Sequence, residues 1–225
     1  MSFISNLFNS APAPQSVPAP IAAAPVIAAQ TPKVPDAFTA ALALTLSEEG
    51  GFGDDARDKG NWTGGECGVG QCLGTNFGVA SSSYADILRN LPSDVRSGMP
   101  WTVKDLTRDQ AGTIYRYRYW NTTRCDELPP PVALVCFDSA VNSGVGRAIQ
   151  WLQGAVGAHV DGGFGPATLA AVTATVKSKG GVALASAVLD ERLAFLRSLA
   201  TFPIYGKGWT RRVSDLRARI TTFPA

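Results

Sequence analysis

A change in composition at residue 36 divides the chain into a short tail and a long segment that can fold. Residues 1–36 hold seven of the fifteen prolines, many alanines and no charged side chain before Lys33. Such a proline-rich segment cannot form a packed core, so we expect a flexible tail there. The 225-residue chain is 45% hydrophobic, which suffices for one large core, or one core with a small accessory lobe, after residue 36.

Helical spacing of apolar residues dominates the rest of the chain. Asp36 is a candidate N-cap, Thr107 and Gln110 have the spacing of a capping box, and Pro166 suits a first helical position. A glycine-rich stretch at 52–83 holds a short β-like piece at 76–80 and predicts an irregular hairpin. The sequence therefore predicts a mainly α (α+β) protein with a small hairpin insertion. The expected helices are 36–49, 106–120, 130–144, 145–157, 165–176 and 182–200.

Charge and hydropathy exclude several classes of partner. The formal net charge of +2 is too small and dispersed to predict nucleic-acid binding. No apolar run reaches the roughly 18 residues of a membrane helix, so we expect no membrane span. No Lys or Arg precedes Lys33, so the chain shows no convincing signal peptide.

The first residues of the tail suggest an attachment point. Phe3, Ile4, Leu7 and Phe8 recur at helical spacing, which suits a small docking helix. A frayed terminus would carry the same residues. Our hypothesis is that the tail anchors the protein to a larger assembly.

The cysteines and the single histidine predict neither a metal site nor a histidine-dependent catalytic site. Cys136 lies in an apolar helical run and is expected to be a buried thiol. Cys67 and Cys72 flank a glycine-rich loop, where they could form a disulfide in an oxidising compartment, but no second pair makes them zinc ligands. His159 has no motif around it and is expected to be a surface or packing residue.

Two glutamates at the end of the first helix differ in their helical phase. Glu49 falls in the apolar stripe of Phe38, Leu42 and Leu46, whereas Glu48 falls toward its edge. A carboxyl group beside apolar side chains is partly desolvated, and the C-terminal end of the helix dipole also disfavours its negative charge. We therefore expect both effects to raise the pKa of Glu49, as a general acid requires. A solvated glutamate at a helix end is the alternative.

Hydrolysis of a glycosidic bond needs a second carboxylate to act on water. Asp54, Asp55 and Asp58 follow Glu49 and are the candidates. Asp54 and Asp55 directly follow Gly-Phe-Gly, where they could simply cap turns. Spacing alone does not choose among the three.

These motifs resemble the glycoside hydrolase family 108 muramidases, which include phage endolysins and secretion-assisting cell-wall hydrolases. The resemblance begins with EGGF at 49–52, the Asp58-Lys-Gly triplet and GTNFGVA at 74–80, and it covers nearly everything after residue 36. It continues through FDSAVNSG at 137–144, the DGxxGPxT pattern at 161–168 and KGWTRRV at 207–213. The DGxxGPxT pattern resembles a peptidoglycan-binding-like helical region. The resemblance implies a tail at 1–36, a lysozyme-like catalytic region at 37–145 and a peptidoglycan-binding-like region at 146–225.

The resemblance also assigns roles to particular residues. Glu49 matches the family's essential glutamate, Asp58 the aspartate of its next motif, and Thr75 its threonine. Phage-type lysozymes likewise place an aspartate nine residues after the acid and then a threonine. A departure at 61–73 inserts residues between Asp58 and Thr75, so Thr63 is the close-spaced alternative. Phe52 replaces the family's usual tyrosine.

Three residues are predicted to contact substrate. Phe52 belongs to the EGGF motif, Trp62 could stack on a sugar ring, and Asn142 could bind an N-acetyl group or cap a turn. Trp209 could also stack or simply pack.

The resemblance implies a lysozyme-type N-acetylmuramidase that cleaves the β-1,4 bond between N-acetylmuramic acid and N-acetylglucosamine in bacterial peptidoglycan, with no metal and no organic cofactor. One alternative is a lytic transglycosylase that uses Glu49 alone. Another is a non-catalytic binding or structural module of a phage tail or cell envelope. We expect a bacteriophage protein that reaches the periplasm and cell wall from the host cytoplasm, or one associated with the virion.

Overall fold

The computed structural model describes residues 36–48 and 51–223 of the chain. The expected tail and docking helix lie outside these residues, apart from Asp36, and so does Glu49. Helix α1 (Ala37–Glu48) begins where expected, because the Asp36 carboxylate accepts a hydrogen bond of 2.8 Å from the backbone N–H of Thr39. That bond lowers the pKa of Asp36.

The predicted irregular hairpin is confirmed. Strands β1 (Thr75–Asn76) and β2 (Val79–Ala80) pair antiparallel, with Thr75 opposite Ala80. Phe77 and Gly78 form the turn with positive φ angles of 48° and 73°. The short helix η1 (Lys59–Asn61) and two isolated bridges, Gly53 to Thr75 and Trp62 to Cys72, order the rest of this glycine-rich region.

A set of short helices connects the hairpin to the longer helices. The predicted capping box is present at the start of α4, where the side chain of Thr107 accepts from the N–H of Gln110 and that of Gln110 accepts from the N–H of Thr107. The helix then continues as a π-helical turn, η3, to Trp120. Helices α2 and α3 were not predicted. The elements are α2 (Ser81–Asn90), α3 (Ser93–Arg96), η2 (Val103–Asp105), α4 (Arg108–Tyr115), η3 (Arg116–Trp120) and η4 (Cys125–Glu127).

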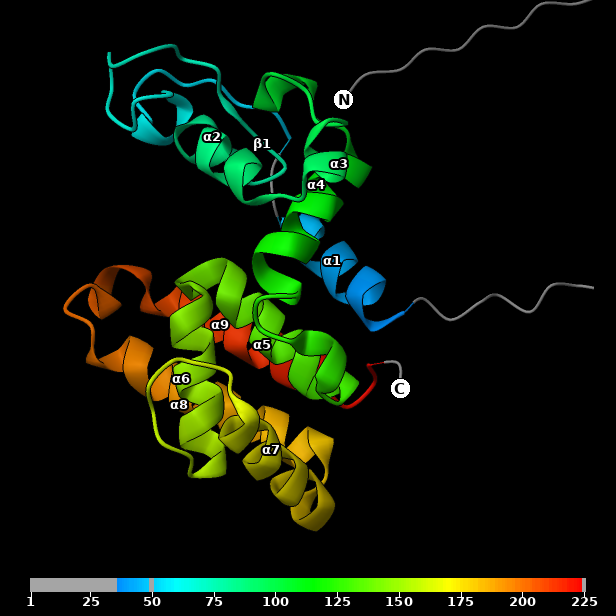
Figure 1. Ribbon diagram of the computed structural model, residues 1–225. Coiled ribbons are helices and arrows are strands. Elements are labelled where there is room, and N and C mark those ends of the chain that lie inside the picture. Colours follow the sequence, from blue (N-terminus) through cyan, green and yellow to red (C-terminus); the bar gives the residue numbers. More distant parts are fainter. Residues whose placement is uncertain (1–35, 49–50, 224–225) are drawn as a thin grey trace, which may run out of the picture. The chain divides into compact units, whose positions relative to one another are not determined.

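Helix α5 (Pro130–Ser143) contacts α1, α6 and α8 (Figure 1). Helix α8 also contacts α7 and α9. The helices α5 to α8 lie where the sequence predicts them, whereas α9 was not predicted as a helix. Their bounds are α6 (Val145–Val156), α7 (Pro166–Lys179), α8 (Gly181–Ser198) and α9 (Phe202–Arg219). The fold is mainly α and lysozyme-like, with one small antiparallel hairpin, as predicted.

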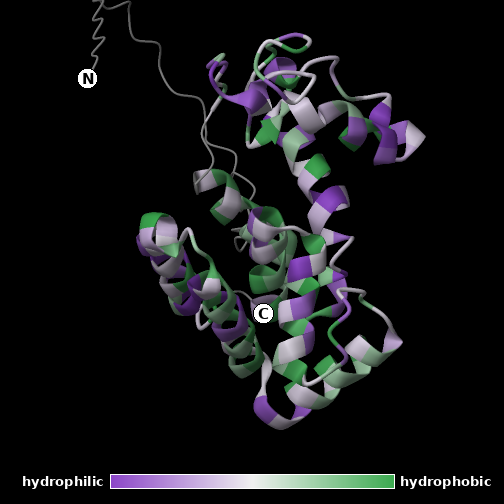
Figure 2. Ribbon diagram, turned by 90° about the vertical axis from the view of Figure 1, so that its left-hand side faces the viewer, coloured by the Kyte–Doolittle hydropathy of each residue, from purple (hydrophilic) through white to green (hydrophobic). Residues whose placement is uncertain are grey.

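Aromatic side chains fill the core around α5. The Phe137 ring is fully buried and lies edge-on to Trp120, with ring centroids 5.6 Å apart, while Phe38 of α1 contacts both rings. Replacing such a buried aromatic with alanine typically costs about 3–5 kcal/mol of folding free energy. Hydrophobic and hydrophilic residues alternate in bands along the helices, as expected for helices that bury one face (Figure 2). This packing fixes α1 against α5.

None of the helices within the described ranges is long and apolar enough to span a membrane.

Candidate active site

An open cavity of about 280 Å³ brings together two of the three predicted catalytic residues. Asp58 and Thr75 both line it, and so does Gly51, which lies two residues after Glu49 in the sequence. Glu49 itself is outside the described residues. We call this the Asp58 cavity; its lining residues are Gly51, Gly53, Asp55, Asp58, Asn61, Thr75 and Gly78.

The buried amide of Asn61 joins the two sides of the Asp58 cavity. Its Nδ2 donates to the backbone carbonyl of Asp55 at 2.9 Å, and its Oδ1 accepts from the Thr75 hydroxyl at 2.7 Å. The backbone carbonyl of Asn61 also accepts from the N–H groups of Leu73 and Gly74. The Asn61 side chain therefore holds the position of the loop before Asp58 and the orientation of the Thr75 hydroxyl. Sequence reasoning did not single out Asn61, because an asparagine beside glycines ordinarily indicates only a turn.

The three candidate aspartates have different surroundings. Asp55 forms an ion pair with Arg57, 2.7 Å from carboxylate oxygen to Nη2, and its hydrogen bonds to the Arg57 side chain and backbone lower its pKa. Asp54 does not line the Asp58 cavity. Asp58 caps η1 by accepting a 2.8 Å bond from Gly60 N–H, and its exposed carboxylate faces the cavity. Asp58 is therefore the cavity-lining aspartate without an arginine partner in the described structure.

The position of Thr75 is set by pairing with the chain just after Glu49. Thr75 and Gly53 exchange backbone hydrogen bonds of 2.8 and 2.9 Å. Thr63, the close-spaced alternative, instead lies within the inserted loop, where its Oγ1 accepts from the N–H of Gln71 at 3.0 Å. The insertion at 61–73 therefore leaves Thr75 rather than Thr63 beside Asp58.

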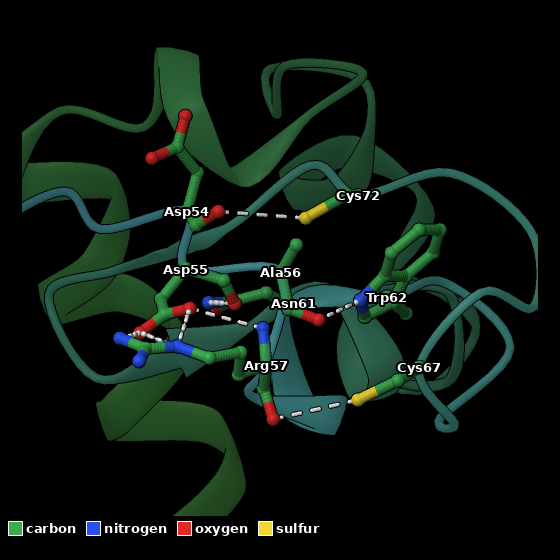
Figure 3. A network of polar contacts seen from close by, with 8 residues as sticks. All are labelled: Asp54, Asp55, Ala56, Arg57, Asn61, Trp62, Cys67 and Cys72. Carbon is green, nitrogen blue, oxygen red and sulfur yellow. Dashed lines mark hydrogen bonds and ion pairs between the residues drawn. The ribbon is translucent and has the colours of Figure 1, made fainter.

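The insertion binds four consecutive backbone carbonyls of the loop that precedes Asp58 (Figure 3). Asn61 donates to the carbonyl of Asp55, and the Trp62 indole N–H donates to that of Ala56 at 2.9 Å. The other two donors are thiols: Cys72 to the carbonyl of Asp54 at 3.6 Å, and Cys67 to that of Arg57 at 3.4 Å. Both thiols are free rather than bridged. These four contacts fix residues 54–57 and hence the start of η1, where Asp58 lies.

The three predicted substrate-contacting residues lie outside the lining of the Asp58 cavity. The Phe52 ring is 41% exposed, covers Gly74 and has Lys104 Nζ 5.6 Å from its centroid. Trp62 donates its indole N–H to the backbone carbonyl of Ala56. Asn142, in the last turn of α5, donates from Nδ2 to the carbonyl of Asp138 at 2.8 Å and lines a second cavity.

That second cavity contains a charged group that sequence reasoning missed. Asp138 is buried in α5 with Arg192 Nη1 at 2.6 Å and Arg212 Nη2 at 2.7 Å. The available signal was an aspartate among the apolar residues of the 130–144 helix, since a buried charge requires a partner. The His159 side chain is 89% exposed, so of the two expected positions, surface or packed, it occupies the surface. Within residues 36–48 and 51–223, no three His, Cys, Asp or Glu side chains are grouped to hold a metal ion.

Comparison with known sequences and structures identifies the family of the chain. The sequence model described as Glycosyl hydrolase 108 matches residues 42–144, and the one described as Predicted Peptidoglycan domain matches 147–214. The chain is similar to Brucella abortus SagA, at 35% identity over 83% of this chain and 94% of that one, with a TM-score of 0.63. The chain belongs to the glycosyl hydrolase 108 family. No curated protein matches it.

Membership of the glycosyl hydrolase 108 family, together with the peptidoglycan-domain match, identifies a glycoside hydrolase that acts on peptidoglycan. The glycosyl hydrolase 108 match includes Glu49, Asp58, Thr75 and the whole insertion. It ends at Gly144, directly after α5.

Proposed function

We propose that the protein is a lysozyme-type N-acetylmuramidase that hydrolyses the β-1,4 bond between N-acetylmuramic acid and N-acetylglucosamine. The observation that supports this proposal is the Asp58 cavity, in which Asp58 and Thr75 lie together beside Gly51. Glu49 is only two residues from Gly51 in the sequence, so the acid and the second carboxylate are contributed by neighbouring segments.

In the proposed mechanism, Glu49 donates its proton to the glycosidic oxygen as the bond to the anomeric carbon breaks. Asp58 accepts a proton from the attacking water or stabilises positive charge on the sugar. The Thr75 hydroxyl donates to Asn61, which leaves its oxygen lone pairs to accept a hydrogen bond from that water. Attack of the water on the anomeric carbon then gives a free reducing end.

Product analysis tests this reaction. Purified peptidoglycan is digested with the wild type, Glu49→Gln and Asp58→Asn, and the muropeptides are identified by mass spectrometry. We expect reducing N-acetylmuramic acid ends from the wild type and a loss of rate of about 10²–10⁴-fold in each variant, as for removal of a general acid or base. Zymography provides an independent measure of clearing.

The two alternatives give different outcomes. A lytic transglycosylase would leave anhydro-muramic ends and would tolerate Asp58→Asn, because the sugar's own hydroxyl replaces water. A non-catalytic binding module would give equal results for the wild type and Glu49→Gln.

The biological context in which the enzyme reaches peptidoglycan is a separate proposal. We propose that residues 1–36 anchor the protein to a larger assembly in a bacteriophage, and that the enzyme acts on the host wall either at lysis or from the virion. Unchanged assembly and delivery after deletion of residues 1–30 would refute the anchor. Detection of the protein in purified virions, compared with the lysate, distinguishes the two routes.

A further inference from the structure

A second cavity, of about 360 Å³, lies among α1, α5 and α9. Its lining comes from both matched regions of the chain, since Thr45 and Asn142 belong to the first match and Trp209 and Arg212 to the second. Thr45 is four residues before Glu49 in the sequence. We call this the Asp138 cavity; its lining residues are Leu44, Thr45, Leu134, Asp138, Asn142, Gly208, Trp209, Arg211, Arg212, Asp215, Leu216 and Arg219.

The Asp138 cavity carries an excess of positive charge. The Asp138 carboxylate faces two guanidinium groups, since Arg212 binds its Oδ1 through Nε at 3.0 Å and Nη2 at 2.7 Å, and Arg192 binds its Oδ2 at 2.6 Å. Three arginines and two aspartates line the cavity, and Arg192 behind Asp138 adds a further positive charge. Positive charge in a partly enclosed cavity attracts anions, because surrounding protein reduces the screening by water.

The outer part of the cavity has guanidinium groups within reach of solvent. Arg219 is exposed, and the Arg211 side chain is 78% exposed with its Nε 3.7 Å from Asp215. Guanidinium groups bind carboxylates with two parallel hydrogen bonds. Arg211 and Arg219 are therefore placed to contact an anionic ligand that enters from solvent, whereas Arg192 and Arg212 are occupied by Asp138.

An aromatic surface adjoins these charges. Trp209 lines the cavity, and the Tyr205 ring lies 5.7 Å from it at an interplanar angle of 35°. Tyr205 is 55% exposed, so the aromatic surface continues from the cavity to solvent. Aromatic faces bind the apolar faces of sugar rings. A ligand that combines a sugar with a carboxylate matches both features.

We propose that the Asp138 cavity binds the anionic stem peptide of a muramyl residue, with Arg211 and Arg219 contacting a stem carboxylate and Trp209 packing against the adjoining sugar. The proposal rests on peptidoglycan being the substrate. In that polymer the sugars of the glycan strand are uncharged and the carboxylates belong to the stem peptides. The cavity therefore distinguishes glycan that carries stems from bare glycan.

The test compares two substrates and three forms of the full-length protein. The substrates are soluble peptidoglycan strands with stem peptides and the same strands after an amidase has removed the stems and the muramyl carboxylates that this exposes have been converted to neutral amides. The proteins are the wild type, the Arg211→Gln/Arg219→Gln double variant and Arg197→Gln, an exposed arginine of α8 that does not line the cavity. We expect the double variant to raise KM on stem-bearing strands by about tenfold, the usual effect of losing one charged hydrogen bond, with kcat unchanged.

The bare strands and the control variant show whether an effect depends on the stem peptide and on these two arginines. The double variant should match the wild type on bare strands, and Arg197→Gln should match it on both substrates. Equal losses on the two substrates would show that the cavity binds sugar alone and would overturn the proposal, as would an unchanged KM on stem-bearing strands. Thermal unfolding checks that the variants are folded.

A binding measurement separates this proposal from the proposed function. If the wild type cleaves neither polymer, muramidase activity is refuted. Retention on beads that carry immobilised stem-bearing strands, or immobilised stem-free strands with amidated muramyl carboxylates, then decides the stem-peptide proposal independently. This proposal requires preferential retention on the stem-bearing strands that depends on Arg211 and Arg219.

Discussion

At the scale of single residues, the hydroxyl of Thr75 has a defined direction. It donates to the Oδ1 of Asn61, and Asn61 is held in turn by its Nδ2 bond to the carbonyl of Asp55. Because the donor is used, Thr75 presents an acceptor to the Asp58 cavity. Thr63 differs because its oxygen accepts from Gln71 N–H within the insertion and does not line the Asp58 cavity.

Replacing Thr75 therefore tests the positioning of water. Thr75→Val keeps the shape but removes the acceptor, and we expect kcat to fall about tenfold, which corresponds to one hydrogen bond. Thr75→Ser should keep most of the activity. The measurement is the initial rate of release of reducing ends from peptidoglycan.

Thr63→Val is the matched control for Thr75→Val. It removes a threonine hydroxyl that also has a hydrogen-bond partner but lies outside the Asp58 cavity, so the rate should change less than twofold. A larger loss for Thr63→Val than for Thr75→Val would assign the catalytic threonine to the insertion instead.

The four thiols should react in two classes. Burial raises the pKa of Cys125 to about 12 and that of Cys136 well above its usual value, because the thiolate would be desolvated. Cys67 is exposed and Cys72 half-buried. We expect a thiol reagent at pH 8 to modify Cys67 and Cys72 in the folded, reduced protein, and all four only in denaturant. Peptide mapping identifies the sites; labelling of Cys136 under native conditions would contradict its burial.

At the scale of secondary structure, the sequence predicted the elements with strong periodicity or clear caps. Helix α5, with prolines at its start and a glycine after its end, and α4, with its capping box, lie where expected. Helix α9 was missed because Pro203, Gly206 and Gly208, which disfavour a helix, lie in its first two turns. It is stabilised by burying Val213 and Leu216 against the rest of the fold.

The candidate site was predictable in part. The resemblance to a known family supplied the identities of the candidate site residues. Local sequence patterns could not place Thr75, because it pairs with Gly53, 22 residues earlier in the chain. The conformation of the insertion was not predictable. Side chains bound to backbone carbonyls order it, and such contacts have no period in the sequence.

The loop between α6 and α7 contains a polar network within the DGxxGPxT pattern. The buried Gln153 donates to the Asp161 carboxylate at 2.7 Å and accepts from the N–H groups of Asp161 and Gly162 at 3.0 and 2.9 Å. The hydrogen bond from Gln153, followed by that from Gly163 N–H, lowers the pKa of Asp161 below 3.8. The residues of the pattern thus form a loop whose conformation is held by hydrogen bonds to the Gln153 side chain.

This network should make stability depend on acid pH. Because the pKa of Asp161 is lower in the folded than in the unfolded state, its stabilisation is complete above about 4 and is lost as pH falls through the folded value. Asp161→Asn keeps an acceptor but cannot titrate there. We expect the unfolding free energy of the wild type to fall more than that of Asp161→Asn between pH 5 and pH 2, measured by urea denaturation. Parallel curves for the two proteins would show that Asp161 does not contribute.

At the scale of the whole folded segment, Asp138 connects three helices that are far apart in the sequence. It lies in α5, and its partners Arg192 and Arg212 lie in α8 and α9. The side chains of Asp138 and Arg192 are only 6% and 4% exposed, and Arg192 Nε has no acceptor among the described residues. The Ser139 hydroxyl, 3.4 Å from Arg192 Nη1, is a further acceptor but carries no charge, so it does not replace a lost carboxylate.

Removing the charge of Asp138 should destabilise the whole fold. Asp138→Asn leaves the buried guanidinium of Arg192 without a counter-ion, and breaking such a pair costs about 3–5 kcal/mol. Asp190→Asn is the matched control, because Asp190 pairs with Arg217 on the same helices α8 and α9 but is 69% exposed, and such pairs contribute about 0–1 kcal/mol. Chemical denaturation of both variants measures the difference. Similar small losses would mean that packing of the apolar residues, rather than the Asp138 ion pairs, determines how α9 is held against α5 and α8.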